Sequence, residues 1–314
     1  MAGTPTALRR DPLPAEIDLT VVPQGFAARP ADPADNPLTP AKVRLGRRLF
    51  FDPVLSGDGK LACASCHDPA HGFAGSTAVA VGARGQKGKR NAPSLLNVGY
   101  NSSFFWDGRS ASLEEQALLP IADPTEMDST PEAAVRRLRA DSSYVEEFRT
   151  AFAGEVTAAN LAKALAAFER TLVSGASAVD RFRHGDVSGL TTDARQGLWL
   201  FESRGGCWRC HADHNLTDGK FHNTGVGAGK DLGRYAVTGR HADRGAFKTP
   251  TLRNVAKTGP YMHDGSMNSL EEIVKYYSRG GNANPNLDPA IKRLDLSDAD
   301  VRHLVAFLEA LTGS

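Results

Sequence analysis

Apolar side chains recur at helical spacing in six stretches of the chain, and these stretches predict its helices. Leu161, Leu165, Phe168 and Leu172 lie four, three and four residues apart, which places them on one face of a helix that begins near Thr157. Further helices are expected near 40–50, over about 131–152 with a break near 141–143, near 192–202, near 268–278, and after the N-cap Ser297, where Val301, Leu304, Val305, Leu308 and Leu311 form the buried face.

The remaining stretches lack such a pattern. Residues 52–101 are rich in glycine and predict loops around a cofactor, because a bound cofactor supplies the apolar core that loops lack. No segment alternates as a strand over more than a few residues, so the fold class is mainly α. Residues 1–38, rich in Pro, Ala and Asp, predict an N-terminal arm, and the loss of periodicity near 174–189 predicts a domain boundary.

All four cysteines belong to two copies of one motif. Residues 63–67 and 207–211 both have the order Cys-x-x-Cys-His, the attachment signature of a c-type haem. Each thiol adds to a haem vinyl group, and the adjacent histidine binds the iron. A redox pair or a four-cysteine zinc site is the alternative, and the histidine after each second cysteine argues against both. The predicted haem-binding residues are Cys63, Cys66, His67, Cys207, Cys210 and His211.

These motifs predict two covalent haem c groups and two cytochrome c-like domains with long loops. The expected domains are 39–180, with the first haem, and 181–314, with the second. The net charge of +1 gives no indication of nucleic acid binding, and no apolar run is long enough to span a membrane. Because bacterial c-type haems are attached outside the cytoplasm, we expect a periplasmic protein whose signal peptide has been removed.

Two haems are compatible with an electron carrier or with an enzyme, and the sixth ligand of each iron distinguishes these classes. A carrier needs a strong sixth ligand on both irons. Methionine is the usual one, and the chain has only Met1, Met127, Met262 and Met267. This small supply favours an enzyme in which one iron keeps an open face.

Several longer motifs indicate which enzyme family this is. The chain resembles the bacterial dihaem cytochrome c peroxidases and their relative MauG over roughly residues 40–312, in order and with both haem motifs in place. The similar segments are 90–95 (Arg-Asn-Ala-Pro-Ser-Leu), 105–109 (Phe-Trp-Asp-Gly-Arg), 113–117 (Leu-Glu-Glu-Gln-Ala), 221–225 (Phe-His-Asn-Thr-Gly), 249–255 (Thr-Pro-Thr-Leu-Arg-Asn-Val) and 258–265 (Thr-Gly-Pro-Tyr-Met-His-Asp-Gly). Together these motifs are highly specific.

The resemblance implies a role for several residues of the first domain. Peroxide would bind at the haem on His67, with Gln116, Pro120 and Glu126 on its distal side and Glu126 as the acid and base of O–O cleavage. Without the resemblance, Glu126 would be interpreted as an ordinary exposed carboxylate. Trp106 matches a tryptophan between the haems that suits electron transfer, and its alternative is a core aromatic residue.

The resemblance also implies metal ligands in the second half of the chain. Tyr277 occupies the position of the sixth ligand of the second haem, where the conventional peroxidases have methionine and MauG has tyrosine. Met267 and Met262 are its rivals, and a packed aromatic residue is the other interpretation of Tyr277. Asn91, Thr258 and Pro260 match an inter-haem calcium site, for which oxygen donors are suitable; a loop Asn and a turn Pro are the alternative.

Two departures from the family pattern affect the function. The conventional peroxidases carry a displaceable distal histidine in the loop that is residues 82–89 here, and this loop contains none. We therefore expect the first haem to be always open, as in MauG, with His71 as the alternative distal ligand. MauG has a further tryptophan shortly before its second haem motif, and residues 202–206 lack it.

The expected function is that of an H2O2-dependent dihaem oxidoreductase that oxidises residues of a partner protein, as MauG does. The alternative is a conventional cytochrome c peroxidase, which reduces H2O2 to water with electrons from a small redox protein. A dihaem electron carrier is the third possibility, and it would need a strong sixth ligand at the iron of His67.

Overall fold

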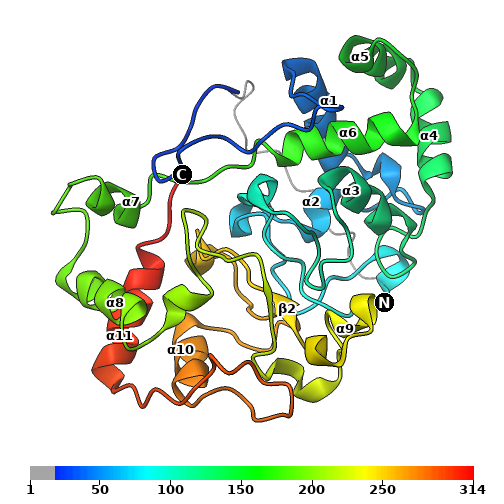
Figure 1. Cartoon of the computed structure of the whole chain (residues 1–314). Helices are drawn as coiled ribbons and strands as arrows, with labels where there is room; N and C mark the ends of the chain where they lie inside the picture. Colours follow the sequence, from blue (N-terminus) through cyan, green and yellow to red (C-terminus); the bar gives the residue numbers. More distant parts are fainter. Residues whose placement is uncertain (1–17) are drawn as a thin grey trace, which may run out of the picture. The chain divides into compact units, whose positions relative to one another are not determined.

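A computed structural model of the chain describes residues 18–314, apart from the side chain of Ala228. The described chain forms two compact units (Figure 1). Unit 1 comprises residues 18–21, Pro30–Tyr100 and Ser110–Val173, and unit 2 comprises Val22–Arg29, Asn101–Arg109 and Ser174–Ser314. Each unit therefore combines segments that are distant in the sequence.

Unit 1 is helical. Its helices are α1 (Pro40–Phe51), α2 (Cys63–Cys66), α3 (Leu113–Ala122), α4 (Pro131–Arg139), α5 (Ser142–Phe152) and α6 (Ala158–Glu169). A short polar side chain precedes all of these except α2 and accepts a hydrogen bond from a backbone N–H of the first turn. These N-caps are Thr39, Ser112, Thr130, Asp141 and Thr157. The helices thus begin where the sequence supplies a cap.

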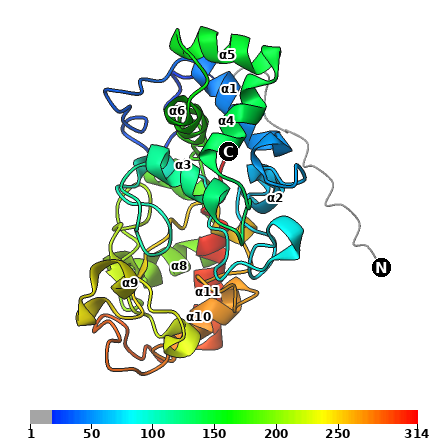
Figure 2. The ribbon, with the colours of Figure 1, turned by 90° about the vertical axis from the view of Figure 1, so that its right-hand side faces the viewer.

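Helices α1 and α6 lie side by side and form the centre of unit 1 (Figures 1 and 2). Their backbones approach closely at Gly46, where an added Cβ atom would lie 1.9 Å from the carbonyl oxygen of Ala164. Only glycine permits this approach. The rings of Phe50 and Phe168, both fully buried, lie 5.2 Å apart between the helices. This helix pair is therefore the packed core beside the first Cys-x-x-Cys-His motif.

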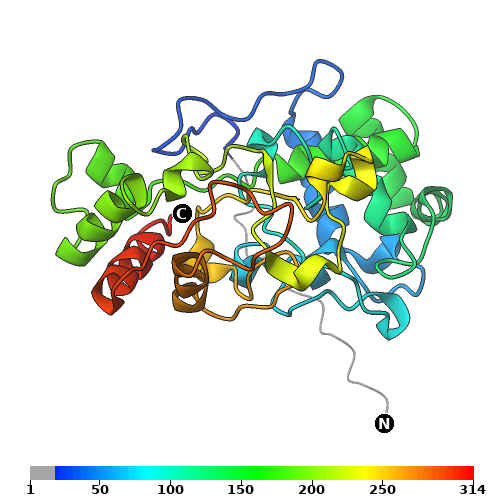
Figure 3. The same ribbon diagram turned by 60° about the horizontal axis from the view of Figure 1, so that its bottom comes forward.

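Unit 2 repeats this arrangement with different residues. Its helices are α7 (Ala178–Arg183), α8 (Thr192–Glu202), α9 (Tyr235–Thr238), α10 (Leu270–Ser278) and α11 (Asp298–Glu309). Helix α8 packs on α11, and a Cβ atom at Gly197 would lie 1.9 Å from the carbonyl oxygen of His303. Phe201 and Phe307 meet at 4.9 Å in the same interface. Helix α10, orange in Figure 3, lies beside the red α11.

Regular structure elsewhere is short. Strands β1 (Phe221–His222) and β2 (Phe247–Lys248) pair antiparallel, with Phe221 opposite Lys248 and His222 opposite Phe247. Single 3-10 turns occupy Pro53–Leu55, Pro69–His71, Ala83–Gly85, Val98–Tyr100, Cys207–Arg209, Val226–Gly229, His241–Asp243 and Val255–Lys257. Within residues 18–314, no helix has the length and apolar character needed to cross a bilayer.

The mainly helical class is confirmed, and so are the expected helix starts after Thr157 and Ser297. The expected break near 141–143 is also present, because α4 ends at Arg139 and Asp141 caps α5. Four of the described helices were not predicted: the one-turn helices α2 and α9, and the longer α3 and α7. Helix α3 contains Pro120, which normally ends a helix, and α7 has only six residues, too few for a clear period.

Of the expected N-terminal arm at 1–38, residues 1–17 lie outside the described residues, and residues 18–38 contain no helix or strand. The expected domain limits at 39–180 and 181–314, with one haem in each, stay predictions. Unit 2 begins its main segment at Ser174 and takes in two earlier segments as well.

Candidate functional site

The first haem motif begins as the short helix α2 and ends at His67. The ring Nδ1–H of His67 donates a hydrogen bond to the carbonyl oxygen of Phe73 at 3.0 Å. This contact leaves Nε2 as the nitrogen that can bind a metal, and such a second hydrogen bond is usual for metal-binding histidines. Burial lowers the pKa of His67, although the bond to Phe73 opposes the change. The imidazole is therefore neutral near pH 7, as a ligand must be.

The two thiols of this motif lie in surroundings that keep them protonated. Burial raises the pKa of Cys63 to about 12 and that of Cys66 to about 11. Redox-active cysteine pairs use a thiolate with a lowered pKa. The raised pKa of both thiols therefore argues against a redox-active pair and fits their addition to an apolar haem edge.

A cavity lies in unit 1 against this motif. Three predicted distal residues, Gln116, Pro120 and Glu126, line it together with both cysteines and His67. The other lining residues are apolar apart from one carboxyl group: Phe50, Leu61, Ala62, Leu95, Ala117, Met127, Leu165 and Glu169. The structure thus brings the residues predicted for the first haem to one apolar cavity that suits a haem.

Glu126 belongs to a turn after α3 that backbone hydrogen bonds hold in place. Its N–H donates to the carbonyl oxygen of Asp123 at 3.0 Å, and its own carbonyl oxygen accepts a bond from Ala83 N–H at 2.7 Å. The hydroxyl and the N–H of Thr125 both donate to the Asp123 carboxylate at 2.7 Å. The half-buried side chain of Glu126 is therefore carried by a well-anchored backbone.

Residues 82–89, where the resemblance led us to look for a distal histidine, form a loop against the Glu126 turn. His71, the alternative distal ligand, is bound through Nδ1 to the carboxylate of Asp68 at 2.8 Å. Its side chain is 42% exposed and is not among the residues that line the cavity. Of the described residues that line the cavity, His67 is the only histidine.

Glu169, which the sequence analysis did not identify, is the other carboxyl group of the cavity. It lies at the end of α6, one turn after Leu165, and is 6% exposed. Burial raises its pKa to about 8, more than the charge of Arg170 lowers it. Its position in the apolar stripe of residues 161–172 was the signal in the sequence, since four residues separate it from Leu165.

The second motif repeats the first in unit 2. The Nδ1–H of His211 donates to the carbonyl oxygen of Leu216 at 3.1 Å, as His67 does to Phe73. Burial lowers the pKa of His211 and raises that of Cys207 to about 11. Both motifs therefore hold a neutral imidazole with Nε2 available.

Helix α10 carries the two tyrosines from which the sixth ligand of the second haem was predicted. Tyr276 is 5% exposed, and its hydroxyl donates to the carbonyl oxygen of Thr224 at 2.8 Å and accepts from Asn282 N–H at 3.2 Å. This hydroxyl is thus used within the protein. Tyr277 lies near the thiols of the second motif, where burial raises its pKa above the ordinary value and a hydrogen bond with the Thr224 side chain opposes that change. The choice of Tyr277 as the ligand stays a prediction.

The two rival methionines precede α10. Met267 is 7% exposed, and its carbonyl oxygen accepts a hydrogen bond from Tyr261 N–H at 2.7 Å. Met262 lies on the same turn with a positive φ of 72°. The assignment of Tyr277 rather than either methionine stays a prediction.

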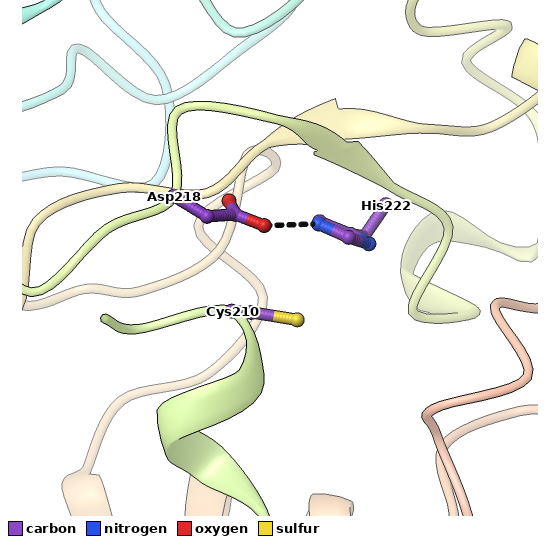
Figure 4. Close-up of side chains that lie close together, drawn as sticks. All are labelled: Cys210, Asp218 and His222. Carbon is purple, nitrogen blue, oxygen red and sulfur yellow. Dashed lines mark hydrogen bonds and ion pairs between the residues drawn. The ribbon is translucent and has the colours of Figure 1, made fainter. Parts of the chain in front are cut away.

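A polar cluster lies next to the second motif on strand β1. Figure 4 shows His222 facing Asp218, with Cys210 close by. His222 Nε2 lies 2.9 Å from an Asp218 carboxylate oxygen, and its Nδ1 lies 2.6 Å from Asp288. The hydrogen bond to the Cys210 thiol is the largest cause that raises the pKa of His222 to about 10, against the effect of burial, and both carboxylates add to it. The two carboxylates hold the imidazole from both ring nitrogens, and the Cys210 sulfur belongs to the haem motif, so we do not interpret the cluster as a separate metal site.

Trp106 lies in unit 2, in the segment Asn101–Arg109. Its carbonyl oxygen accepts a hydrogen bond from the backbone N–H of Lys248 on β2 at 2.8 Å. The Lys248 ammonium group donates to the carbonyl oxygen of Ser103 at 2.6 Å, and Arg234 donates to the carbonyl oxygen of Asp107 at 2.9 Å. Three hydrogen bonds from two segments therefore fix the backbone around a half-buried Trp106.

The residues predicted to bind calcium lie in both units. Asn91, 5% exposed in unit 1, donates from its amide to the carbonyl oxygen of Thr77 at 3.0 Å. Thr258 and Pro260 lie in unit 2, where the Thr258 hydroxyl donates to the carbonyl oxygen of Val255 at 3.1 Å. The calcium site stays a prediction.

Comparison with known proteins gives consistent matches. Residues 40–188 match the family model of the di-haem cytochrome c peroxidases. The methylamine utilization protein MauG of Methylorubrum extorquens is 45% identical over 89% of this chain and 80% of its own length. The cytochrome c551 peroxidase of Nitrosomonas europaea is 38% identical over 92% of this chain and 87% of its own length.

A solved structure is also similar over almost the whole chain. It is that of a MauG-like protein associated with microbial copper homeostasis, with a TM-score of 0.84 and 34% sequence identity. The match covers 96% of both chains. The similarity therefore extends over both units.

Proposed function

This chain belongs to the di-haem cytochrome c peroxidase family, which includes MauG, and we propose that it acts as a MauG-like member. It is a haem-dependent oxidoreductase of the peroxidase type. The family implies two haem groups, H2O2, and a protein substrate or redox partner. In the proposed reaction H2O2 takes two electrons and two protons and becomes two water molecules, and the electrons come from side chains of a partner protein.

The observation that carries this proposal is the cavity of unit 1, in which His67 is the only histidine among the described lining residues. A second imidazole there would close the distal face in the resting state. With none in the wall and His71 bound to Asp68, the site needs no activating reduction. This is the behaviour expected of a MauG-like enzyme.

The residues of both motifs fit covalently attached haem. Each motif offers two cysteine thiols and a neutral imidazole that is oriented through Nδ1. When bound, the haem supplies an iron that binds peroxide and exchanges single electrons. The proposed holding residues are Cys63, Cys66 and His67 for the first haem and Cys207, Cys210, His211 and Tyr277 for the second.

Glu126 is the proposed acid and base. Its carboxylate accepts a proton from the entering H2O2 and returns it to the leaving oxygen, so that water rather than hydroxide departs. The amide of Gln116 donates a hydrogen bond to the peroxide, and the ring of Pro120 contributes apolar wall beside them. The anchored backbone of Glu126 keeps its carboxyl group in place for both proton transfers.

Tyr277 is the proposed sixth ligand of the second haem. A phenolate is an anionic oxygen donor and stabilises oxidised iron more than a thioether does. The second haem would then hold oxidising equivalents rather than accept electrons from a small donor protein. Trp106, whose backbone is fixed by Lys248, is the proposed route for electrons between the two haems.

The alternative function is that of a conventional cytochrome c peroxidase. The observation that favours it is the sequence at 202–206, which lacks the tryptophan of MauG before the second motif. Such an enzyme would take its electrons from a small redox protein. The two functions share Glu126, Gln116 and both haems, and they differ in the electron source.

We also propose that the enzyme binds a calcium ion. Asn91, Thr258 and Pro260 would supply an amide and carbonyl oxygens, with waters and haem propionates as further donors. Removal of calcium with a chelator should slow the reaction with H2O2, and added Ca²⁺ should restore it.

Because c-type haems are attached outside the bacterial cytoplasm, we place the enzyme in the periplasm.

The test is the addition of one equivalent of H2O2 to the fully ferric dihaem protein, followed at once by optical and EPR spectroscopy. A MauG-like enzyme reacts promptly and gives a long-lived oxidised state. A reaction that requires prior reduction of one haem would identify the conventional peroxidase. No reaction in either state would identify an electron carrier and overturn the proposal.

A further inference from the structure

Glu169 is a buried carboxylic acid, and the protein does not provide hydrogen-bond partners for both of its oxygens. Its side chain is 6% exposed, and its Oε2 atom has no hydrogen-bond partner among the described residues. It is the only buried side-chain oxygen or nitrogen of residues 18–314 in that condition. A buried polar atom without a partner destabilises the fold, so it calls for a specific explanation.

The adjacent cation does not satisfy this carboxyl group. Arg170 directs its guanidinium to Glu114, with Nη1 and Nη2 at 2.7 and 2.8 Å from the two carboxylate oxygens. The amide of Asn36 also donates to Glu114, at 2.7 Å. Glu169 is therefore left beside an ion pair that is already complete, and it is protonated at neutral pH.

The position of Glu169 in the cavity wall indicates where its missing hydrogen-bond partner would lie. Glu169 and Leu165 line the same cavity as Cys63, Cys66 and Glu126. Apart from His67, Gln116 and Glu126, the other lining side chains are apolar or belong to the two cysteines, so the carboxyl group of Glu169 has few polar neighbours in the wall and is available to whatever fills the cavity. A protonated carboxyl group donates a hydrogen bond most strongly to an anionic or water oxygen.

We propose that Glu169 is a cofactor-binding residue of unit 1, which donates a hydrogen bond from its neutral carboxyl group to an oxygen at the bound haem. The acceptor is a haem propionate or a water held against the haem, since these are the oxygen acceptors that a filled cavity contains. The inference rests on the proposed attachment of a haem at Cys63 and Cys66. It is distinct from the role of Glu126, because no proton of the peroxide passes through Glu169.

The hydrogen bond has a defined effect on the haem. A donor at a propionate or water offsets negative charge and favours the reduced iron, so its loss lowers the reduction potential. Ionisation of Glu169 at high pH also lowers the potential, because it places a negative charge near the iron. The other charged or titratable groups around Glu169 are Arg170, Glu114, Glu126 and the Cys63 sulfur, of which the last is a thioether once haem is attached.

The experiment compares the dihaem forms of the wild type, Glu169→Gln, Glu169→Leu and the surface control Glu132→Gln. The readouts are the haem content per chain and the potentials of both haems from pH 6 to 10. We expect two haems in every variant, with one potential lowered in Glu169→Leu. In the wild type one potential falls as the pH rises through the range above 8, and in Glu169→Gln it does not. Glu132→Gln should match the wild type.

Resonance Raman spectra separate the two acceptors. Shifted propionate bending modes in Glu169→Leu identify a propionate, and unchanged modes with a lowered potential identify a water. Unaltered potentials in both Glu169 variants at every pH would overturn the inference. If Glu169→Leu does not fold, the pH profile of Glu169→Gln decides alone. A chain that carries no haem at Cys63 and Cys66 would instead contradict the proposed function, which is a separable result.

Discussion

The backbone N–H of Ala83 donates a hydrogen bond to the carbonyl oxygen of Glu126 at 2.7 Å. The loop at 82–89, which contains no histidine, therefore holds the backbone of Glu126, the proposed acid and base, in position. Gly57 N–H makes the matching contact from the other side, to the carbonyl oxygen of Met127 at 2.8 Å. The turn that carries Glu126 is thus held between two loops.

Gly82→Ala should disturb this support. A Cβ atom at Gly82 would lie 2.1 Å from the carbonyl oxygen of Thr125 and 2.5 Å from that of Glu126, so the turn must move. We expect the reaction with H2O2 to slow by about tenfold to a hundredfold, because small displacements of catalytic groups have effects of that size. The measurement is stopped-flow spectroscopy of the ferric protein.

Gly88→Ala is the matched control in the same loop. A Cβ atom there meets its nearest neighbour, the carbonyl oxygen of Ala80, at the ordinary distance of 3.4 Å. Its rate should stay within about twofold of the wild type. Equal rates for both variants would mean that the loop does not position Glu126.

Tyr277→Phe should remove the proposed sixth ligand of the second haem. We expect a changed optical spectrum, a higher potential for one haem, and a shorter-lived oxidised state after H2O2. Tyr276→Phe is the control, since its hydroxyl is bonded to Thr224 and Asn282. That variant should lose about 1 kcal/mol of stability and keep its spectrum. An unchanged spectrum for Tyr277→Phe would favour Met267 or Met262 as the ligand.

The ion pair of Asp180 and Arg253 should be a major source of stability in unit 2. Arg253 contacts both carboxylate oxygens, at 2.8 and 3.0 Å, and both side chains are at most 5% exposed. Arg253→Met leaves a buried carboxylate without its counter-ion and should cost about 3 kcal/mol or more. The quantity to measure is the thermal stability of the dihaem protein by calorimetry.

An exposed pair of the same chemistry serves as the comparison. Arg149 contacts both oxygens of Glu146, with the closest nitrogen at 2.7 Å, and both side chains are at least 60% exposed. Arg149→Met should cost less than about 1 kcal/mol. If both substitutions had the same effect, burial would not be the reason for the strength of the Asp180–Arg253 pair.

The same pair predicts a pH dependence of stability. Burial alone raises the pKa of Asp180, but hydrogen bonds from Arg253 and Ser177 outweigh it and hold the pKa below the ordinary value. Its contribution is therefore complete above about pH 4, the unfolded value, and is lost as the pH falls through the lower folded value. The stability difference between wild type and Asp180→Asn should shrink with acidification below pH 4. A difference that is constant from pH 6 to 2 would contradict this linkage.

Those helices that are specified by local signals in the sequence could be predicted. Thr157 and Ser297 cap their helices as expected, because a cap and an apolar stripe are local signals. Helix α3 was missed, since its stripe is short and includes Pro120. Its formation depends on tertiary packing against α6, which no local pattern contains.

In the candidate site, too, some residues could be predicted from the sequence and others depend on the fold. The two Cys-x-x-Cys-His motifs are contiguous and were found from the sequence, whereas the role of Glu126 was predicted only through the family resemblance. Glu169 was not, because a single carboxyl group on an apolar face does not reveal what covers it. The contact of His222 with Asp288 could not be predicted from the sequence either, because 66 positions separate the two residues and only the fold brings them together.

The glycine contacts at Gly46 and Gly197 have a consequence for the order of folding. Each closes a helix pair whose second member, α6 or α11, is synthesised long after the haem motif that follows the first. Such long-range contacts form late, because the intervening loop must first lose its entropy. Until then the thiols of each motif remain accessible to haem and to the machinery that attaches it. If haem is attached at these motifs as proposed, the late packing of α6 and α11 would limit the period in which attachment can take place.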